Sequence, residues 1–302
     1  MESFNRLIRD YGSSLEELFK SEYNYFISQI RGFYEAVKEK LNENRKLRIG
    51  IVGQIKSGKS TFLNCYLFNG EEILPKAITP MTASLTFITY SPQNKIEIEF
   101  FNENDIENLK KDSSQVSKRT YELIMKTGKN YIGKKIEKKF ENRNELKQEL
   151  IKYVSESGEY SHLVKSLSLY INDEFLRYIE IVDTPGLNDP IISRSIKTIQ
   201  FLERCDVILL LSRASQFLED ADIKLLLEQI RKPVKVYIIA SRFDQVLVDA
   251  LSSSDQKIDF LDLYNKEYEK RKNRFIKFIS EKNLSNLIDN EKLFIFSSLF
   301  FK

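Results

Sequence analysis

Residues 53–60 read Gly-Gln-Ile-Lys-Ser-Gly-Lys-Ser and follow an almost wholly apolar stretch. This spacing is the G-x-x-x-x-G-K-[ST] pattern of a phosphate-binding loop between a strand and a helix. Gly53 and Gly58 allow the backbone to close around an anion, so that N–H groups of the loop and of the next helix face phosphate oxygens. Lys59 is predicted to reach the β- and γ-phosphates of a nucleotide, and Ser60 to offer its hydroxyl to Mg²⁺.

The flanks of this loop have the character that the pattern requires. Residues 47–52 are apolar or Gly apart from Arg48, as in a buried strand, and residues 61–67 suit a helix. The alternative interpretation is a glycine-rich turn with a surface lysine. The nucleotide-binding candidates in this segment are Gly53, Gln54, Ile55, Lys56, Ser57, Gly58, Lys59, Ser60 and Thr61.

A second candidate motif follows the apolar run at 178–182, where the chain reads Asp183-Thr184-Pro185-Gly186. A carboxylate at a strand end can hold Mg²⁺ through a water, which makes Asp183 a metal-site candidate. Gly186 can turn its N–H toward the γ-phosphate because no side chain intervenes. A simple Pro-Gly turn is the alternative.

A hydroxyl is also needed at the metal between the loop and Asp183. Residues 79–83 read Thr-Pro-Met-Thr-Ala. Thr82 is our candidate for metal binding and catalysis, with Thr79 as the fallback and a plain loop threonine as the alternative. The predicted metal set is therefore Ser60, Thr82 and Asp183.

Residues that could read the base follow two later apolar runs. Asp244, in Ser-Arg-Phe-Asp at 241–244, can accept two hydrogen bonds from guanine N1–H and its exocyclic amine, a donor pair that adenine lacks. The stem of Arg242 could lie on the purine face. Ser297 and Ser298 close the last apolar run, where a backbone N–H would meet guanine O6.

Composition limits the classes of function. The net charge of +3 is too small to indicate nucleic acid as a partner, and we expect none. The two cysteines, Cys65 and Cys205, suit buried free thiols in a reducing cytoplasm. The single His162 argues against metal chemistry on His and Cys ligands. The first residues lack a secretory signal, and no apolar run is long enough to span a bilayer.

Apolar spacing outlines the elements that must position these residues. Residues 1–46 are predicted to be an N-terminal helical segment, and 47–302 one domain. Alternation of strands and helices indicates an α/β fold, a phosphate-loop domain with a mostly parallel central sheet covered by helices. We expect 84–90 and 95–101 to form a hairpin. Further strands are expected at 167–171, 178–182, 207–211, 234–240 and 293–296, and helices at 219–231 and 260–282.

Residues 102–165 differ from the rest. Between Lys110 and Lys152 there are 13 Lys or Arg against 6 Asp or Glu. The simpler interpretation is an inserted set of solvated helices. The alternative is a basic surface for anionic lipid or, less favoured because no aromatic residues are arranged for stacking, nucleic acid.

With these motifs in this order, the chain resembles a GTPase of the dynamin superfamily and is most similar to bacterial dynamin-like proteins. The motifs are GQIKSGKSTFLN at 53–64, LP-x₄-PMTA at 74–83, IVDTPGLND at 181–189 and SRFD at 241–244. The 123 residues from Ser60 to Asp183 exceed what a minimal Ras-like domain needs. The family also packs an N-terminal helix into a bundle beside the GTPase domain, which agrees with the helical segment predicted at 1–46.

Three departures from the family pattern bear on mechanism. Arg242 stands where the family usually has Lys, preceded by Ser241 rather than Thr or Asn. Ile55 stands where eukaryotic dynamins place a Gln that positions water. Lys56 matches the position of a cis arginine finger in guanylate-binding proteins, and it could supply that positive charge directly.

The resemblance implies an Mg²⁺-dependent enzyme that hydrolyses GTP to GDP, with Lys59, Thr82 and Lys56 as its catalytic residues. It further implies a homodimer through the GTPase face, or a pair with a second dynamin-like protein. Membrane remodelling would act through lipid-binding parts absent from these residues, in the cytoplasm or at the inner face of the membrane. The chain ends five residues after Ser297, so we expect a piece of a larger system. The alternatives are a nucleotide-gated binding module with little hydrolysis, an ATPase of the same fold, and an Era-like or septin-like GTPase.

Overall fold

A computed structural model describes residues 45–75, 85–112, 115–155, 158–184, 202–229, 235–252, 259–282, 284, 288 and 293–297. The chain divides into two compact units, Met1–Arg45 and Lys46–Lys302. The helices predicted for residues 2–44 lie outside the described residues, so only the second unit is considered from here on.

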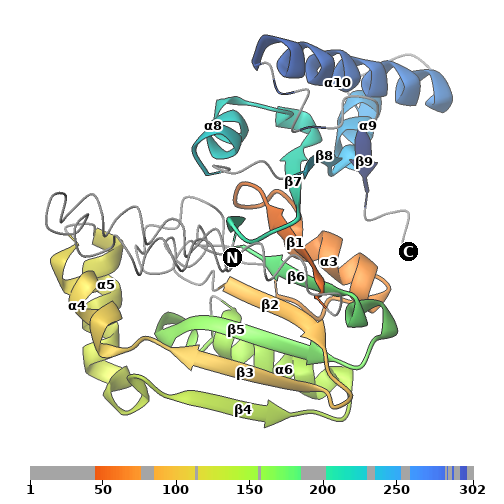
Figure 1. Cartoon of the computed structure of the whole chain (residues 1–302). Helices are drawn as coiled ribbons and strands as arrows, with labels where there is room; N and C mark the ends of the chain where they lie inside the picture. Colours follow the sequence, from red (N-terminus) through yellow and green to blue (C-terminus); the bar gives the residue numbers. More distant parts are fainter. Residues whose placement is uncertain are drawn as a thin grey trace, which may run out of the picture. The chain divides into compact units, whose positions relative to one another are not determined.

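The second unit is built on a nine-stranded sheet with the order β4-β3-β5-β2-β6-β1-β7-β8-β9 (Figure 1). The strands β6, β1, β7, β8 and β9 run parallel to one another, and antiparallel pairs join β2 to β6 and β3 to β5 and β4. The predicted mostly parallel α/β fold is therefore confirmed. The strands are β1 Leu47–Val52, β2 Leu85–Tyr90, β3 Lys95–Phe100, β4 Lys135–Lys139, β5 Val164–Ile171, β6 Ile179–Asp183, β7 Val207–Arg213, β8 Lys235–Ser241 and β9 Phe294–Phe296.

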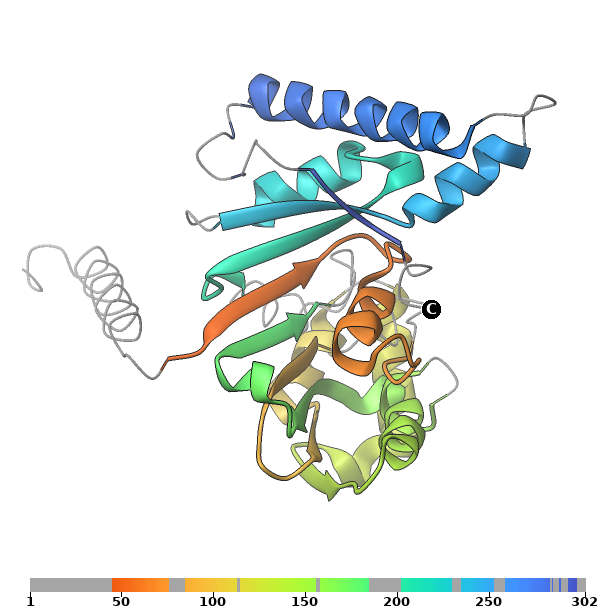
Figure 2. The same ribbon diagram turned by 90° about the vertical axis from the view of Figure 1, so that its right-hand side faces the viewer.

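The helices cover both faces of this sheet, and in Figure 2 α3 and α10 lie on opposite sides of β1, β7 and β8. A parallel sheet must be buried on both faces, which is why its central strands are apolar at successive positions. The α-helices of the described residues are α3 Lys59–Phe68, α4 Glu103–Lys111, α5 Gln115–Leu123, α6 Arg143–Val154, α8 Asp220–Gln229, α9 Phe243–Ser252 and α10 Phe260–Lys282.

Alternate residues of the central strands enter two separate cores. Ile51 and Ile181 pack into the first core, together with side chains of α3, α4 and α6. Their neighbours Val52 and Val182 pack into the second core, which includes side chains of α9 and α10. The central strands are thus fixed from both sides, and the loops at their ends inherit that rigidity.

The predicted hairpin of 84–90 and 95–101 is wrong. Both strands form, as β2 and β3, but β5 lies between them and pairs with each. The physical reason is that β5 offers buried Leu167 and Leu169, which lie opposite Ile98 and Ile96 of β3. The four residues that link β2 to β3 step across one strand instead of closing a tight turn. A 3₁₀ turn, Glu174–Arg177, lies between β5 and β6.

The interpretation of 102–165 as solvated helices is also incomplete. The segment contains the edge strand β4, a π-helical turn at Ile124–Gly128 and buried side chains of the first core. The sequence did not predict β4, because this strand, Lys-Ile-Glu-Lys-Lys, consists almost entirely of charged residues. Lys95 of β3 binds Glu97 and the cross-strand Glu137 at 2.6 and 2.8 Å, so opposite charges support the pairing.

Asn64 connects α3 to the segment that follows it. Its buried side chain donates to Leu74 O at 3.0 Å and accepts from Leu74 N at 2.8 Å. Both bonds are shielded from water, so losing them leaves two buried backbone groups unsatisfied.

We predict that Asn64→Ala lowers the free energy of unfolding by about 2–4 kcal/mol, because each stranded buried group costs about 1–3 kcal/mol. Urea unfolding monitored by circular dichroism measures this. Asn144→Ala, at an exposed position of α6, is the control and should change stability by less than about 0.5 kcal/mol. Equal stability of the two variants would contradict the role given to Asn64.

Candidate functional site

The predicted site residues gather at one edge of the sheet. The phosphate loop follows β1, Asp183 ends β6, Arg242 follows β8 and Ser297 follows β9. These strands are parallel, and Ile51 of β1 lies opposite Asp183 while Ser241 of β8 lies opposite Phe296 of β9. Loops at the carboxyl ends of parallel strands are where α/β folds bind ligands.

Two glycines give the phosphate loop its shape. Gly53 has φ +156°, and a Cβ placed on it would lie 2.5 Å from Leu211 O and 2.6 Å from Ser57 Oγ. Gly58 has φ +92°, in the left-handed region that other residues seldom adopt. A larger residue at position 53 would push the loop off β7. The geometry therefore matches the reason for which sequence spacing singled out these glycines.

The start of α3, directly after the loop, presents backbone N–H groups that have no acceptor within the helix. Gly58 caps the helix without a side-chain hydrogen bond, and the first turn of α3 contains no acidic residue. The first helical bond runs from Phe62 N to Gly58 O at 2.8 Å, so the N–H groups of the preceding residues Lys59, Ser60 and Thr61 have no helical acceptor. Such a helix start carries partial positive charge and suits an anion.

Lys59 is turned back onto the loop. Its ammonium donates to Gly53 O at 2.9 Å and Gln54 O at 3.0 Å. Burial lowers the pKa of Lys59, and the negative charge of Asp183 opposes that shift. The two carbonyls are neutral acceptors, so they supply no counter-charge for the ammonium.

Asp183 presents the opposite charge. Its Oδ1 is buried and has no hydrogen-bond partner among the described residues. Burial raises the pKa of Asp183 to about 6, while the charge of Lys59 acts to lower it. A carboxylate oxygen that is removed from water without a donor is costly unless a cation or a proton meets it.

These residues fit a hard divalent cation. Mg²⁺ commonly takes one or two protein oxygens and completes its shell with water and substrate phosphate. Asp183 offers an unsatisfied oxygen, and Ser60 lies in the first turn of α3. The described part of the chain holds no group of three or more His, Cys, Asp or Glu residues that would form an all-protein metal cage.

The segment predicted to read the base lies against the phosphate loop. Ser241 is buried, and its hydroxyl lies 2.6 Å from Ser57 O and 3.2 Å from Ser212 O, so it ties β8 to the loop. A Cβ placed on Gly58 would lie 4.0 Å from Arg242 Cγ. Arg242 itself is exposed and left-handed, with φ +54°, and Asp244 occupies the first turn of α9.

Other predicted residues divide between described and undescribed positions. Lys56 is exposed and left-handed, with φ +64°, and Ser297 is buried directly after β9. Thr82, its fallback Thr79, Gly186 and Ser298 lie outside the described residues. The predicted first hydroxyl of the metal set therefore stays a prediction, as does the glycine that faces the γ-phosphate.

Three polar residues of the site escaped sequence analysis. Thr184 donates its hydroxyl to Ile51 O at 2.8 Å and holds the end of β6 to β1. Asp222 of α8 accepts from Gln54 Nε2 at 2.9 Å, and its other oxygen accepts from Ser212 Oγ at 2.6 Å. Asp222 lies 168 residues from Gln54, so no local spacing could have shown this contact.

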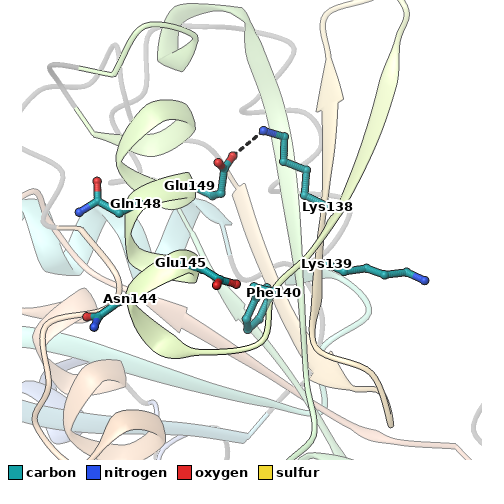
Figure 3. A pocket seen from close by; sticks show the side chains of 7 residues that line it. All are labelled: Lys138, Lys139, Phe140, Asn144, Glu145, Gln148 and Glu149. Atoms are coloured by element: carbon teal, nitrogen blue, oxygen red, sulfur yellow. Dashed lines mark hydrogen bonds and ion pairs between the residues drawn. The ribbon is translucent and has the colours of Figure 1, made fainter.

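A separate groove of about 520 Å³ lies between β4 and α6 (Figure 3). Lys138 and Glu149 point toward one another across it and form an ion pair at 2.7 Å. Four strands separate β4 from β1 in the sheet, so this groove is remote from the phosphate loop. Its lining residues are Lys138, Lys139, Phe140, Asn144, Glu145, Gln148 and Glu149.

None of the helices in the described ranges combines the length and apolar character needed to cross a bilayer.

Comparisons with known proteins agree with this geometry. The model of the Dynamin family matches residues 49–241. Dynamin-like protein 1 of Campylobacter jejuni is 30% identical over 230 residues, which are 71% of this chain and 31% of that protein. The bacterial dynamin-like protein of Nostoc punctiforme is 30% identical over 209 residues, which are 69% of this chain and 26% of that protein.

A solved structure shares the fold. A chain from an oligomerised bacterial dynamin pair, described as a mechanism for long-range sensing and tethering of membranes, superposes with a TM-score of 0.57 at 22% identity. That match covers 100% of this chain and 39% of the other. The chain thus spans about a third of the length of these relatives.

The resemblance drawn from the sequence motifs is confirmed, and the Era-like or septin-like alternative is set aside. The matched segment contains the phosphate loop, Asp183 and Ser241, the residues that meet at the carboxyl edge of the sheet. This chain belongs to the dynamin family, and its nine-stranded unit is a GTPase domain of the dynamin type.

Proposed function

We propose that the domain binds GTP with Mg²⁺ and hydrolyses it to GDP and phosphate. The observation that carries the proposal is the pair of charges at the phosphate loop. Among the described residues, Lys59 donates hydrogen bonds to neutral carbonyls alone, and Asp183 has a buried oxygen without a hydrogen-bond partner. A nucleotide phosphate and a magnesium ion would satisfy both.

The phosphate-binding roles follow from position. The N–H groups at the start of α3 would hold the phosphate oxygens, and Lys59 would move its ammonium from the loop carbonyls toward the β- and γ-phosphates. Thr61 would contribute an N–H from the same turn. Because the N–H groups are fixed by the start of α3 before the reaction, they can stabilise the charge that spreads over the γ-phosphate oxygens.

The metal-binding roles belong to Ser60, Thr82 and Asp183. When bound by these residues, Mg²⁺ would supply positive charge that offsets the charge of the phosphates. Thr82 is proposed to bring its hydroxyl to the metal, and Gly186 to turn its N–H toward the γ-phosphate. The segments around these two residues would order with GTP and relax after hydrolysis.

The base-binding roles belong to the loop after β8 and to the end of β9. Asp244 would accept from guanine N1–H and its amine, Arg242 would lie over the purine, and a backbone N–H at Ser297 or Ser298 would meet O6. The tether from Ser241 to Ser57 O supports this, because it fixes the base-reading loop against the phosphate loop.

The catalytic water needs a ligand other than residue 55, because Ile55 has no hydrogen-bonding side chain. Lys56 is our candidate for the added positive charge at the transition state. Its left-handed backbone and exposed side chain leave the ammonium free to turn toward a phosphate or toward a second domain. If no residue supplies that charge, the domain is instead a nucleotide-gated binding module with little hydrolysis.

In the complete protein we propose that two such domains associate across their nucleotides, as a homodimer or with a second dynamin-like chain. One solved relative is an oligomerised bacterial dynamin pair described as tethering membranes, which supports this assembly. Membrane remodelling, at the inner face of the membrane, would be performed by other parts of the protein. Nucleic acid has no part in the proposal.

We predict that the domain prefers GTP over ATP by at least about 100-fold, because adenine would cover the Asp244 carboxylate without offering it a hydrogen-bond donor. Asp244→Ala should reduce this preference to below about 10-fold. Competition of unlabelled GTP and ATP against a fluorescent guanine nucleotide measures both. Asp262→Ala, which removes a first-turn acid of α10, controls for loss of helix-dipole stabilisation. Equal affinity of the unaltered domain for the two nucleotides would refute the role of Asp244.

Lys56→Ala should lower turnover by at least about tenfold, since one positive charge at the transition state is worth several kcal/mol. Lys56→Arg should retain most of the rate. Phosphate release is measured under multiple turnover over a range of protein concentrations, and the rate per molecule should rise with concentration if two domains associate. A Lys56→Ala rate within twofold of the original would exclude Lys56 from catalysis. If the unaltered domain binds GTP but releases no phosphate, the result would instead support a nucleotide-gated binding module.

A further inference from the structure

Gln54, the second residue of the phosphate loop, has its side chain directed away from the loop toward α8. Its Nε2 donates to Asp222 Oδ1 at 2.9 Å. Its backbone carbonyl accepts from Lys59 Nζ at 3.0 Å. The same residue therefore holds the ammonium of Lys59 through its main chain and a distant carboxylate through its side chain.

Asp222 is an unusual partner for a loop amide. It is only 1% exposed, and both of its oxygens accept hydrogen bonds from neutral donors, Gln54 and Ser212. Burial raises the pKa of Asp222, and those two hydrogen bonds act to lower it. A buried carboxylate without a hydrogen-bonded cation costs stability, so its position needs an explanation beyond helix formation.

The support behind Asp222 is rigid. Ser212 lies at the end of β7 and is fully buried, and its hydroxyl also accepts from Leu218 N at 2.9 Å. Leu218 is left-handed, with φ +52°, and its carbonyl accepts from Arg274 Nη2 of α10 at 3.1 Å. The carboxylate is thus held by the central sheet and by the turn that begins α8.

We infer that Asp222 is a positioning residue for the triphosphate site, acting through Gln54. The fixed carboxylate holds the Gln54 amide, and this orients the Gln54 carbonyl that restrains Lys59. Without the hydrogen bond between Gln54 and Asp222, the loop between Gly53 and Ser57 can rotate. The Gln54 carbonyl then no longer holds the ammonium of Lys59 beside the position that the phosphates would occupy. The inference rests on the proposed function, since the substrate that gains from this order is Mg²⁺-bound GTP.

The experiment is a double-mutant cycle with Gln54→Met, Asp222→Ala and the two combined. Methionine keeps the length of the side chain but removes the donor. The readouts are the dissociation constant for GTP with Mg²⁺, the separate kcat and KM, and the melting temperature without nucleotide. Tyr170→Phe is the matched control, because it removes a neutral donor to a partly buried carboxylate, Glu97 at 3.0 Å, in the other half of the sheet.

We expect Gln54→Met to weaken GTP binding by about tenfold, while its melting temperature stays within the range of Tyr170→Phe. The double variant should bind no more weakly than Asp222→Ala alone, because both changes break one link. Gln54→Met within twofold of the original affinity would overturn the inference, and so would additive losses in the double variant. If Asp222→Ala fails to fold, the Gln54→Met affinity alone decides. Absence of GTP binding by the unaltered chain would refute the proposed function instead.

Discussion

The structure depends on keeping opposite charges close together, partly out of water, at the carboxyl edge of a parallel sheet. Lys59 begins α3, the helix that follows β1, and Asp183 ends β6, the strand beside β1. The charge of each residue acts on the pKa of the other in the direction that favours the charged form. Neither finds a full counter-charge in the described chain. The cost of holding such groups is tolerable because a triphosphate and a divalent cation would bring the missing charges.

The rest of the fold keeps this edge rigid. Alternate residues of β1 and β6 enter two cores on opposite faces of the sheet, so neither strand can rotate or slip without exposing apolar side chains. Polar tethers then tie the loops to one another. Thr184 holds the end of β6 to Ile51 O, and Ser241 holds β8 to Ser57 O. The phosphate loop, the end of β6 and the end of β8 are therefore held in place by the fold itself, which is what electrostatic preorganisation requires.

Sequence reasoning succeeded where chemistry is local and failed where contacts are distant. The phosphate loop was predicted because two glycines, a lysine and a serine are spaced by the geometry of one turn. The central strands were predicted because burial on both faces leaves long apolar runs. The pairing of β5 between β2 and β3 was missed, since strand order depends on which apolar faces meet rather than on chain order. β4 was missed because its exposed charges conceal a paired edge strand. Asp222 has no motif around it, and only the fold brings it to Gln54.

The most direct measurement of the central claim is a calorimetric titration of the folded chain with GTP in the presence of Mg²⁺, with Lys59→Ala titrated in parallel. The account predicts saturable uptake of one nucleotide per chain. It also predicts that Lys59→Ala binds roughly 10–150-fold more weakly, as expected for loss of a hydrogen bond from a charged donor. Absence of any heat of binding with the folded, unaltered chain would contradict the account.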